Sequence, residues 1–175
     1  MIALKIAGGV VAALLAYVLI AGSVVARGHV TSVRIVLKRP PAEVFAVISD
    51  RAAQTQWRAD LKSVEILPPQ DGRVVFRETT RMGPVRYVVD EAEAGRRLVT
   101  RILDEDLGYR GRWIFELEPD GAGTRLTITE EGEVTSWMFR ALSPFFSKTA
   151  TLEAYLKALA AKFGETAALA VLRAA

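Results

Sequence analysis

Apolar and polar residues are unevenly distributed along the chain, and the longest apolar segment comes first. An uncharged run extends from Ile6 to Ala26 and is bracketed by Lys5 and Arg27. At a helical rise of about 1.5 Å per residue, this run covers roughly the 30 Å hydrocarbon core of a bilayer. We therefore expect a single transmembrane anchor in residues 1–27, followed by one domain in residues 28–175.

The same run allows two other interpretations. Val24-Val25-Ala26 before Arg27 is compatible with signal-peptide cleavage, although the run is longer than the usual apolar core of such peptides. A buried helix of a soluble domain is less favoured, because Gly8, Gly9 and Gly22 weaken a soluble helix and no polar face interrupts the run. The retained anchor is the interpretation that we favour.

Basic residues next to the run predict its orientation, because they favour the cytoplasmic side of a membrane. Only Lys5 precedes the run, whereas several basic residues follow it: Arg27, Arg34, Lys38 and Arg39. We expect a cytoplasmic domain if the anchor is retained, and an exported domain if a signal peptide is cleaved.

After residue 27, the pattern changes to short strands and helices. Residues 30–38 alternate apolar with polar or basic side chains, as a strand with one face in water does. Pro40-Pro41 ends this strand and opens a short helix with an apolar side. Asp50 can cap a second short helix that ends near Trp57.

Strands separated by turn residues fill the middle of the chain. They are predicted over residues 61–67, 73–81, 85–92, 98–103, 109–117 and 124–134. Short connections such as Pro119–Gly123 join antiparallel neighbours.

A final helix begins at about Ser147. Its stripe of mostly apolar residues, at spacings of three and four, consists of Phe145, Thr149, Leu152, Leu156, Leu159 and Phe163. The stripe must pack against the sheet. We therefore predict an α+β domain with helices on one face of an antiparallel sheet.

The composition limits the chemistry. The chain has 23 Lys and Arg against 20 Asp and Glu. Lys5 and Arg27 belong to the predicted anchor, so the domain keeps 21 basic and 20 acidic residues, a balance that gives no support to nucleic-acid binding. It has no cysteine, which excludes disulfides and thiolate metal sites. Its only histidine, His29, lies next to the predicted membrane exit, so we expect no metal, no cofactor and no Ser-His-Asp triad.

Several local sequences carry a family resemblance. They are Pro41-Ala42-Glu43-Val44-Phe45, Ile48-Ser49-Asp50, Trp57, Gly111-Arg112-Trp113, Phe115-Glu116-Leu117, Gly123-Thr124-Arg125-Leu126, Glu130-Glu131-Gly132-Glu133, the segment from Leu152 to Leu159, and Phe163-Gly164. With the order of elements, they resemble the START-like superfamily, also called SRPBCC, and its polyketide cyclase/dehydrase and coenzyme Q-binding-like branch.

The resemblance covers about residues 31–164. It implies a helix-grip fold, in which a curved antiparallel sheet wraps around the C-terminal helix and leaves an apolar cavity. Members of such families mostly bind lipids, quinones, hormones or polyketides, and some use the cavity for cyclisation or dehydration.

Strand alternation predicts which side chains face this cavity, because successive residues of a strand point to opposite faces. Together with the helices, it gives a predicted binding set of Phe45, Trp57, Phe76, Glu78, Tyr87, Val89, Thr100, Trp113, Phe115, Ile128, Thr149, Leu152 and Leu156. For Trp113 core packing is favoured over ligand contact, and for Trp57 the two are even. Thr149 interrupts the apolar stripe and could hydrogen-bond a ligand, although a threonine there is more often just a tolerated small residue.

The polar members of the inner face are the weak catalytic candidates. Glu78, Tyr87 and Glu130 could act in proton transfer if their carboxyl and hydroxyl groups lie together in the cavity. The favoured alternative is that both glutamates lie at strand ends, where solvent reaches them.

An aromatic-rich segment precedes the final helix and contains Trp137, Met138, Phe139, Leu142, Phe145 and Phe146. We expect burial under the edge of the sheet. The alternative is contact with lipid headgroups, to which Arg140 and Lys148 would be suited.

The sequence leads to one favoured function and two alternatives. The favoured function is membrane-anchored binding or transfer of a hydrophobic small molecule, such as a lipid, an isoprenoid quinone or a polyketide-like compound. The first alternative is a polyketide cyclase/dehydrase-like enzyme. The second is a protein-interaction module that uses arginines of the outer sheet face, with an unknown partner.

Overall fold

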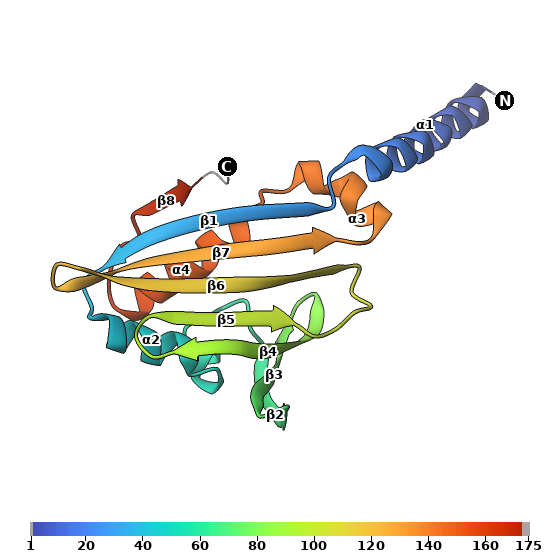
Figure 1. Ribbon diagram of the computed structural model, residues 1–175. Helices are drawn as coiled ribbons and strands as arrows, with labels where there is room; N and C mark the ends of the chain where they lie inside the picture. Colours follow the sequence, from blue (N-terminus) through green and yellow to red (C-terminus); the bar gives the residue numbers. More distant parts are fainter. Residues whose placement is uncertain (1, 173–175) are drawn as a thin grey trace.

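The computed structural model describes the backbone of residues 2–172 and the side chains of residues 8–172 (Figure 1). The helices are α1 (Ile2–Val24), α2 (Pro41–Ser49), α3 (Trp137–Leu142) and α4 (Ala150–Lys162), with 3₁₀ helices η1 (Ala52–Gln56) and η2 (Ser143–Phe145). The strands are β1 (Gly28–Leu37), β2 (Ser63–Gln70), β3 (Arg73–Thr80), β4 (Gly83–Glu93), β5 (Arg97–Ile102), β6 (Tyr109–Asp120), β7 (Gly123–Val134) and β8 (Leu169–Leu172).

One antiparallel sheet contains all the strands, in the order β2-β3-β4-β5-β6-β7-β1-β8. Consecutive strands from β2 to β7 are joined by short connections, and Asp71 and Gly72 between β2 and β3 both have positive φ, at 51° and 73°. Positive φ at both central residues is the geometry that two-residue hairpins require. The six central strands predicted from the sequence are therefore confirmed as an antiparallel meander.

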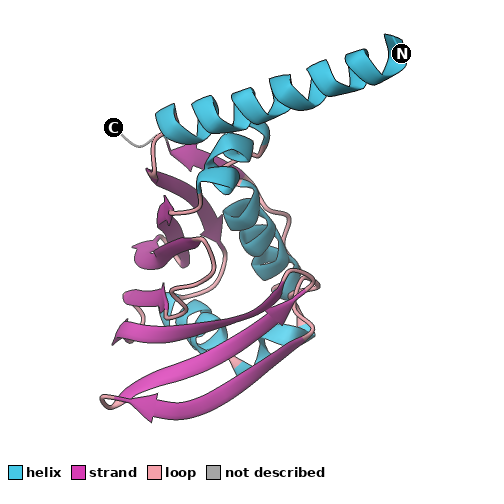
Figure 2. Cartoon of the chain, turned by 90° about the vertical axis from the view of Figure 1, so that its right-hand side faces the viewer, coloured by secondary structure: helices cyan, strands magenta, loops and turns pink. Residues whose placement is uncertain are grey.

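Helix α4 lies in the concavity of this curved sheet (Figure 2). Its residues Leu152, Leu156 and Leu159 are fully buried against the core. Opposite them, Ile35 and Leu126 are also buried on the inner faces of β1 and β7. The predicted α+β class and the helix-bearing face of the sheet are confirmed.

Two local expectations at the C-terminal end were wrong. Helix α4 begins at Ala150 rather than Ser147, because Ser147 to Thr149 form a turn in which Ser147 Oγ accepts a hydrogen bond from Thr149 N at 3.3 Å. Phe145 therefore lies outside α4 and is 70% exposed. Strand β8 was not predicted, because its four residues, Leu169–Leu172, are too few to show an alternating pattern, and the strand forms by pairing with β1.

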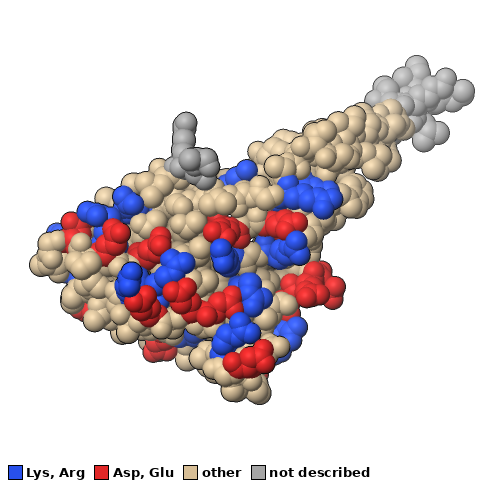
Figure 3. Space-filling view, in the orientation of Figure 1, with Lys and Arg blue, Asp and Glu red and all other residues tan. Residues whose placement is uncertain are grey.

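The outer face of the sheet carries alternating charges. Arginines pair with carboxylates on neighbouring strands, as in Arg101–Asp90 at 2.7 Å and Arg112–Glu131 at 2.7 Å. Figure 3 shows the basic and acidic side chains interspersed over this face. Because many of its arginines are already paired, this face gives little support to the protein-interaction alternative.

Within the part of the chain that the structure describes, no helix has both the length and the apolar character needed to cross a bilayer. The structure therefore does not support the transmembrane anchor predicted for residues 1–27. The first residues of the predicted span, Ile6 and Ala7, lie outside the described side chains.

The C-terminal half of α1 packs against α3. Tyr17 Oη donates a hydrogen bond to the carbonyl of Ala141 at 3.1 Å, and Arg140 Nε donates to the carbonyl of Gly22 at 2.8 Å. A Cβ atom at Gly22 would lie only 2.5 Å from the carbonyl oxygen of Trp137, so the close approach of the two helices requires glycine. Part of the apolar run thus contacts the domain itself.

Candidate ligand-binding site

The space between the sheet and α4 has a tightly packed end and an aromatic end. At the packed end, Ile128, Leu152 and Leu156 are completely buried in the aliphatic core. These residues belong to the predicted binding set, and the structure places them in the core. Phe45 and Val89 are partly buried and also pack against this core.

The aromatic end is organised around Tyr155 of α4. Its ring makes edge-to-face contacts with Trp57, Trp113 and Phe115, at centroid distances of 5.4, 5.6 and 5.6 Å. Nearby on the sheet, Phe76 and Tyr87 stack at 5.3 Å. Strands β3, β4 and β6, the end of η1 and α4 therefore bring their large aromatic side chains to one region, as the sequence predicted for all of them except Tyr155.

A buried polar cluster lies beside these rings. Arg58 Nη1 donates to Glu78 Oε1 at 3.0 Å and to Gln54 Oε1 at 2.9 Å, and Arg58 Nη2 donates to Asp60 Oδ2 at 2.7 Å. Gln54 is fully buried and in turn donates to the carbonyl of Ile48 at 3.0 Å. The Arg58 guanidinium thus joins Gln54 of η1 and Glu78 of β3 to Asp60, which lies between η1 and β2.

The placement of Glu78 corrects one expectation. Glu78 is only 8% exposed, and its carboxylate is paired with Arg58. The carboxylate therefore does not lie in water at a strand end. Glu130 is more accessible, and its carboxylate lies 3.4 Å from His29 Nε2. The two glutamates therefore have different partners and do not form an acid–base pair with each other.

Arg51, directly before η1, is a second buried cation near this cluster. Its guanidinium carbon lies 4.9 Å from the centre of the Phe76 ring, and the residue is 6% exposed. Its Nε and Nη2 atoms, like the Tyr155 hydroxyl, are buried and have no hydrogen-bond partner among the described residues. The site therefore contains both satisfied and unsatisfied polar groups.

Burial controls the protonation of the tyrosines. It raises the pKa of Tyr155 to about 12 and, reinforced by the nearby carboxylate of Glu78, raises the pKa of Tyr87 well above its usual value. Both hydroxyls therefore stay protonated in alkaline solution in which an ordinary tyrosine, with a pKa of about 10, begins to ionise.

Burial has the opposite effect on the two cations. It lowers the pKa of Arg51. It would also lower the pKa of Arg58, but the carboxylates of Glu78 and Asp60 more than offset it and raise that pKa. Only Arg58 therefore has charge compensation strong enough to reverse the effect of burial.

A pocket of about 300 Å³ opens at the aromatic end. It is lined by Arg58, Asp60, Trp113, Ala150, Thr151, Ala154 and Tyr155. Ala150, Thr151 and Ala154 are exposed and form its rim on α4. The pocket therefore connects solvent with the buried aromatic cluster.

A larger depression of about 500 Å³ lies between β2, β3 and β4 and involves Asp104. Its charges already pair with each other, since Arg77 contacts Glu65 at 2.7 Å and Arg86 contacts Asp104 at 2.6 Å. We therefore assign the candidate ligand site to the smaller, aromatic pocket.

Two further predicted residues have partners within the protein. Thr100 is 7% exposed and lies opposite Trp113 on the neighbouring strand. Thr149 donates its hydroxyl hydrogen to Glu153 Oε1 at 2.6 Å. Thr149 therefore gives no support to the idea that its hydroxyl serves a ligand.

Sequence reasoning missed Arg51, Gln54, Arg58 and Tyr155. The first three lie in or next to a short 3₁₀ helix, where no regular period marks a buried position. Tyr155 had a usable signal, because it follows Leu152 by three residues and precedes Leu159 by four.

Residues 28–168 match the family described as polyketide cyclase / dehydrase and lipid transport. The chain belongs to this family. The superfamily resemblance seen in the sequence is thereby confirmed. A search among curated proteins finds no match.

Solved structures share the fold. A START superfamily protein from Mycobacterium smegmatis is 22% identical, with a TM-score of 0.62 over 77% of this chain and 96% of that one. ZhuI aromatase/cyclase from Streptomyces sp. R1128 is 15% identical, with a TM-score of 0.61 over 77% and 93%. Truncated norcoclaurine synthase from Thalictrum flavum is 13% identical, with a TM-score of 0.61 over 79% and 96%. At these identities the similarity concerns the fold alone.

Proposed function

We propose that this member of the family binds a hydrophobic small molecule between its sheet and α4, and admits it through the pocket beside Trp113 and Tyr155. The observation that carries the proposal is this pocket, which leads from solvent to a cluster of aromatic rings. Apolar and aromatic walls with a few polar groups are typical of small-molecule sites. The fold of the family is consistent with such a ligand.

Binding accounts for the geometry better than acid–base catalysis does. The carboxylate of Glu78 is held by Arg58, and burial raises the pKa of Tyr87 further above neutral pH than that of an ordinary tyrosine. A general acid or base works best with a pKa near the operating pH. The cyclase/dehydrase-like alternative therefore has no poised proton-transfer pair among these candidates.

The binding proposal can be tested by filling the pocket. Ala154 is an exposed lining residue, so Ala154→Trp should occupy the entrance, whereas Ala161→Trp places the same bulk on an exposed part of α4 outside it. Each purified protein is extracted with organic solvent, and the extract is examined by mass spectrometry. We expect an apolar compound with the wild type and Ala161→Trp, and much less of it with Ala154→Trp. Equal recovery from all three proteins, or none from any, would contradict the proposal.

We also propose that the protein meets this ligand at a lipid surface. The support is an exposed apolar surface on α1, α3 and η2, which we call the apolar helical surface. Its members on α1 are Val10, Val11, Leu14, Leu15, Leu19, Ile20 and Val24, and those near α3 are Trp137, Met138, Phe139, Leu142, Phe145 and Phe146. So much exposed apolar area is unusual for a monomer in water.

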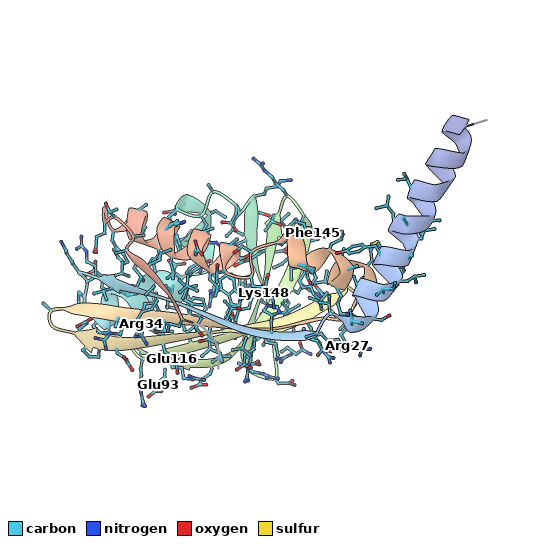
Figure 4. All side chains as sticks on the ribbon, turned by 90° about the horizontal axis from the view of Figure 1, so that it is seen from above. Arg27, Arg34, Glu93, Glu116, Phe145 and Lys148 are labelled. Carbon is cyan, nitrogen blue, oxygen red and sulfur yellow. The ribbon has the colours of Figure 1, made fainter. Side chains whose placement is uncertain are left out.

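Burial of the aromatic-rich segment under the sheet edge, which the sequence favoured, is therefore wrong. Phe145 and Phe146 are each 70% exposed. In Figure 4, Phe145 lies on the helical side of the molecule, away from Glu93 and Glu116. Arg140 is buried and donates to backbone carbonyls, so it is not available to a headgroup, whereas Lys148 is exposed.

Flotation with lipid vesicles tests this second proposal. The double variant Phe145→Ser/Phe146→Ser removes two exposed rings, and Val36→Ser removes an apolar residue that is 53% exposed on the outer face of β1. With vesicles of phosphatidylcholine and phosphatidylglycerol, we expect the wild type and Val36→Ser to float and the double variant to float less. Undiminished flotation of the double variant would show that these rings do not contact lipid.

A further inference from the structure

Three polar atoms in the candidate site have no partner. They are Arg51 Nε, Arg51 Nη2 and the Tyr155 hydroxyl, which are buried and make no hydrogen bond within the described residues. The residues themselves are 6% and 4% exposed. Buried polar groups in proteins are nearly always paired, and a buried charge without a partner is especially costly. These atoms therefore indicate a missing acceptor.

The free atoms of Arg51 have a specific geometry. Nε and Nη2 lie on one edge of the planar guanidinium, and this edge can donate two parallel hydrogen bonds to the two oxygens of a carboxylate. The flat face of the group is already used, since it lies over the ring of Phe76 at 4.9 Å. The Phe76 ring holds one face of the guanidinium, and the donor edge is buried without a hydrogen-bond acceptor among the described residues.

Charge points to the same class of acceptor. Arg58 is paired with Glu78 at 3.0 Å and with Asp60 at 2.7 Å, whereas Arg51 makes no ion pair with any described residue. The two carboxylates of the cluster are therefore both held by Arg58, and the Arg51 guanidinium has no anionic partner of its own. A bound anion would supply that partner.

The surroundings of Tyr155 supply the rest of a binding site. Its ring is held by Trp57 and Trp113, and it lines the pocket that opens beside Ala154. Its hydroxyl is buried and has no partner of its own. Arg51 is not among the residues that line the pocket, so an apolar chain would meet the aromatic walls, and its polar end would have to move deeper than the lining to reach the Tyr155 hydroxyl and Arg51.

We propose that Arg51 and Tyr155 bind the carboxylate of an amphipathic carboxylic acid whose apolar part lies among the aromatic side chains of the pocket. This inference rests on the proposed binding function and specifies the class of ligand. Arg51 Nε and Nη2 donate one hydrogen bond to each carboxylate oxygen, and the Tyr155 hydroxyl donates a further one. Arg58 keeps its own carboxylate partners and is a neighbour rather than the anion receptor.

Calorimetric titration of the full chain with decanoate tests the inference. Methyl decanoate and decanol serve as uncharged comparison ligands. Arg51→Met removes the donor edge, and Tyr155→Phe removes only the hydroxyl. Arg39→Met is the matched control, because Arg39 also stacks on an aromatic ring, that of Phe163 at 5.7 Å, but is 43% exposed in its side chain. Since hydrogen bonds to charged groups are strong, we expect Arg51→Met to weaken decanoate binding about 10- to 100-fold and Tyr155→Phe about 5- to 10-fold.

The outcomes separate the inference from the proposed function. The inference is supported if decanoate binds more tightly than both uncharged ligands and if this preference is lost in Arg51→Met but kept in Arg39→Met. If all three ligands bind equally to the wild type and to Arg51→Met, the pocket binds apolar molecules and the carboxylate assignment is wrong. If none of the three ligands binds to the wild type, the proposed function itself fails. Should Arg51→Met fail to fold, an unchanged decanoate preference in Tyr155→Phe overturns the inference and a reduced one supports it.

Discussion

The buried ion pair between Arg58 and Glu78 allows a quantitative prediction. Both side chains are about nine-tenths buried, at 9% and 10% exposure, and their nearest atoms are 3.0 Å apart. Removing one member of such a pair typically costs about 3–5 kcal/mol, because the other charge remains buried without compensation. The two single substitutions should nevertheless differ, since the two residues have different numbers of partners.

Glu78→Gln should be the milder change. Arg58 would keep its contacts with Asp60 at 2.7 Å and with Gln54 at 2.9 Å, so we expect a loss of about 2–3 kcal/mol in the free energy of unfolding. Arg58→Met should cost about 4–5 kcal/mol, because it leaves both Glu78 and the buried Gln54 side chain without their partner. For a chain of this size, the milder loss corresponds to a decrease in Tm of about 4–12 °C.

Urea unfolding at pH 7, followed by circular dichroism, measures these losses. The double variant Arg58→Met/Glu78→Gln completes a thermodynamic cycle, and we expect the two changes to be non-additive by about 2–3 kcal/mol. The control is Arg77→Met, which breaks the exposed pair with Glu65 and should change stability by less than about 1 kcal/mol. A coupling energy below about 0.5 kcal/mol, or single losses no larger than that of the control, would refute the reasoning.

Three other predictions concern nearby features. Arg51→Met should raise the Tm of the ligand-free protein in a thermal melt, because it removes a buried guanidinium whose Nε and Nη2 have no partner among the described residues; a lower Tm would contradict this. Burial raises the pKa of Tyr155 from 10.0 to about 12, so its contribution to stability should be complete below pH 10 and be lost as the pH rises towards 12. Unfolding curves between pH 8 and 11.5 should show that loss in the wild type and a smaller one in Tyr155→Phe. Gly22→Val should separate α1 from α3, because its Cβ would meet the carbonyl of Trp137 at 2.5 Å, whereas Gly9→Val meets nothing; equal protease sensitivity at α3 would argue against this packing.

Most of the fold could be predicted because its signals are local. Alternating side chains mark β3 to β7, proline marks the start of α2, and apolar residues at helical spacing mark α4. Strand β8 carries no such signal, because it exists only through its pairing with β1. The packing of the apolar N-terminal run against the domain could not be predicted from local sequence either. Its contact at the carbonyl of Gly22 comes from Arg140, which is far away along the sequence.

The candidate site could be predicted only in part, for the same reason. Alternation correctly placed Phe76, Tyr87 and Trp113 on the inner face, because direction along a strand is fixed by the backbone. It could not show that Glu78 pairs with Arg58, because that contact depends on where the segment after η1 lies relative to β3. Nor could it identify Arg51 as an unpaired cation, because that property depends on the surrounding side chains.

The central claim is that an apolar molecule enters between the sheet and α4. The three tryptophans of the chain provide an internal test, because Trp57 and Trp113 contact Tyr155 in the site, whereas Trp137 lies on α3 and is 52% exposed. Their indole N–H signals can be followed by NMR during a titration with decanol. The account predicts that the signals of Trp57 and Trp113 shift and saturate while that of Trp137 stays in place. A shift of Trp137 alone, or of none of the three, would contradict it.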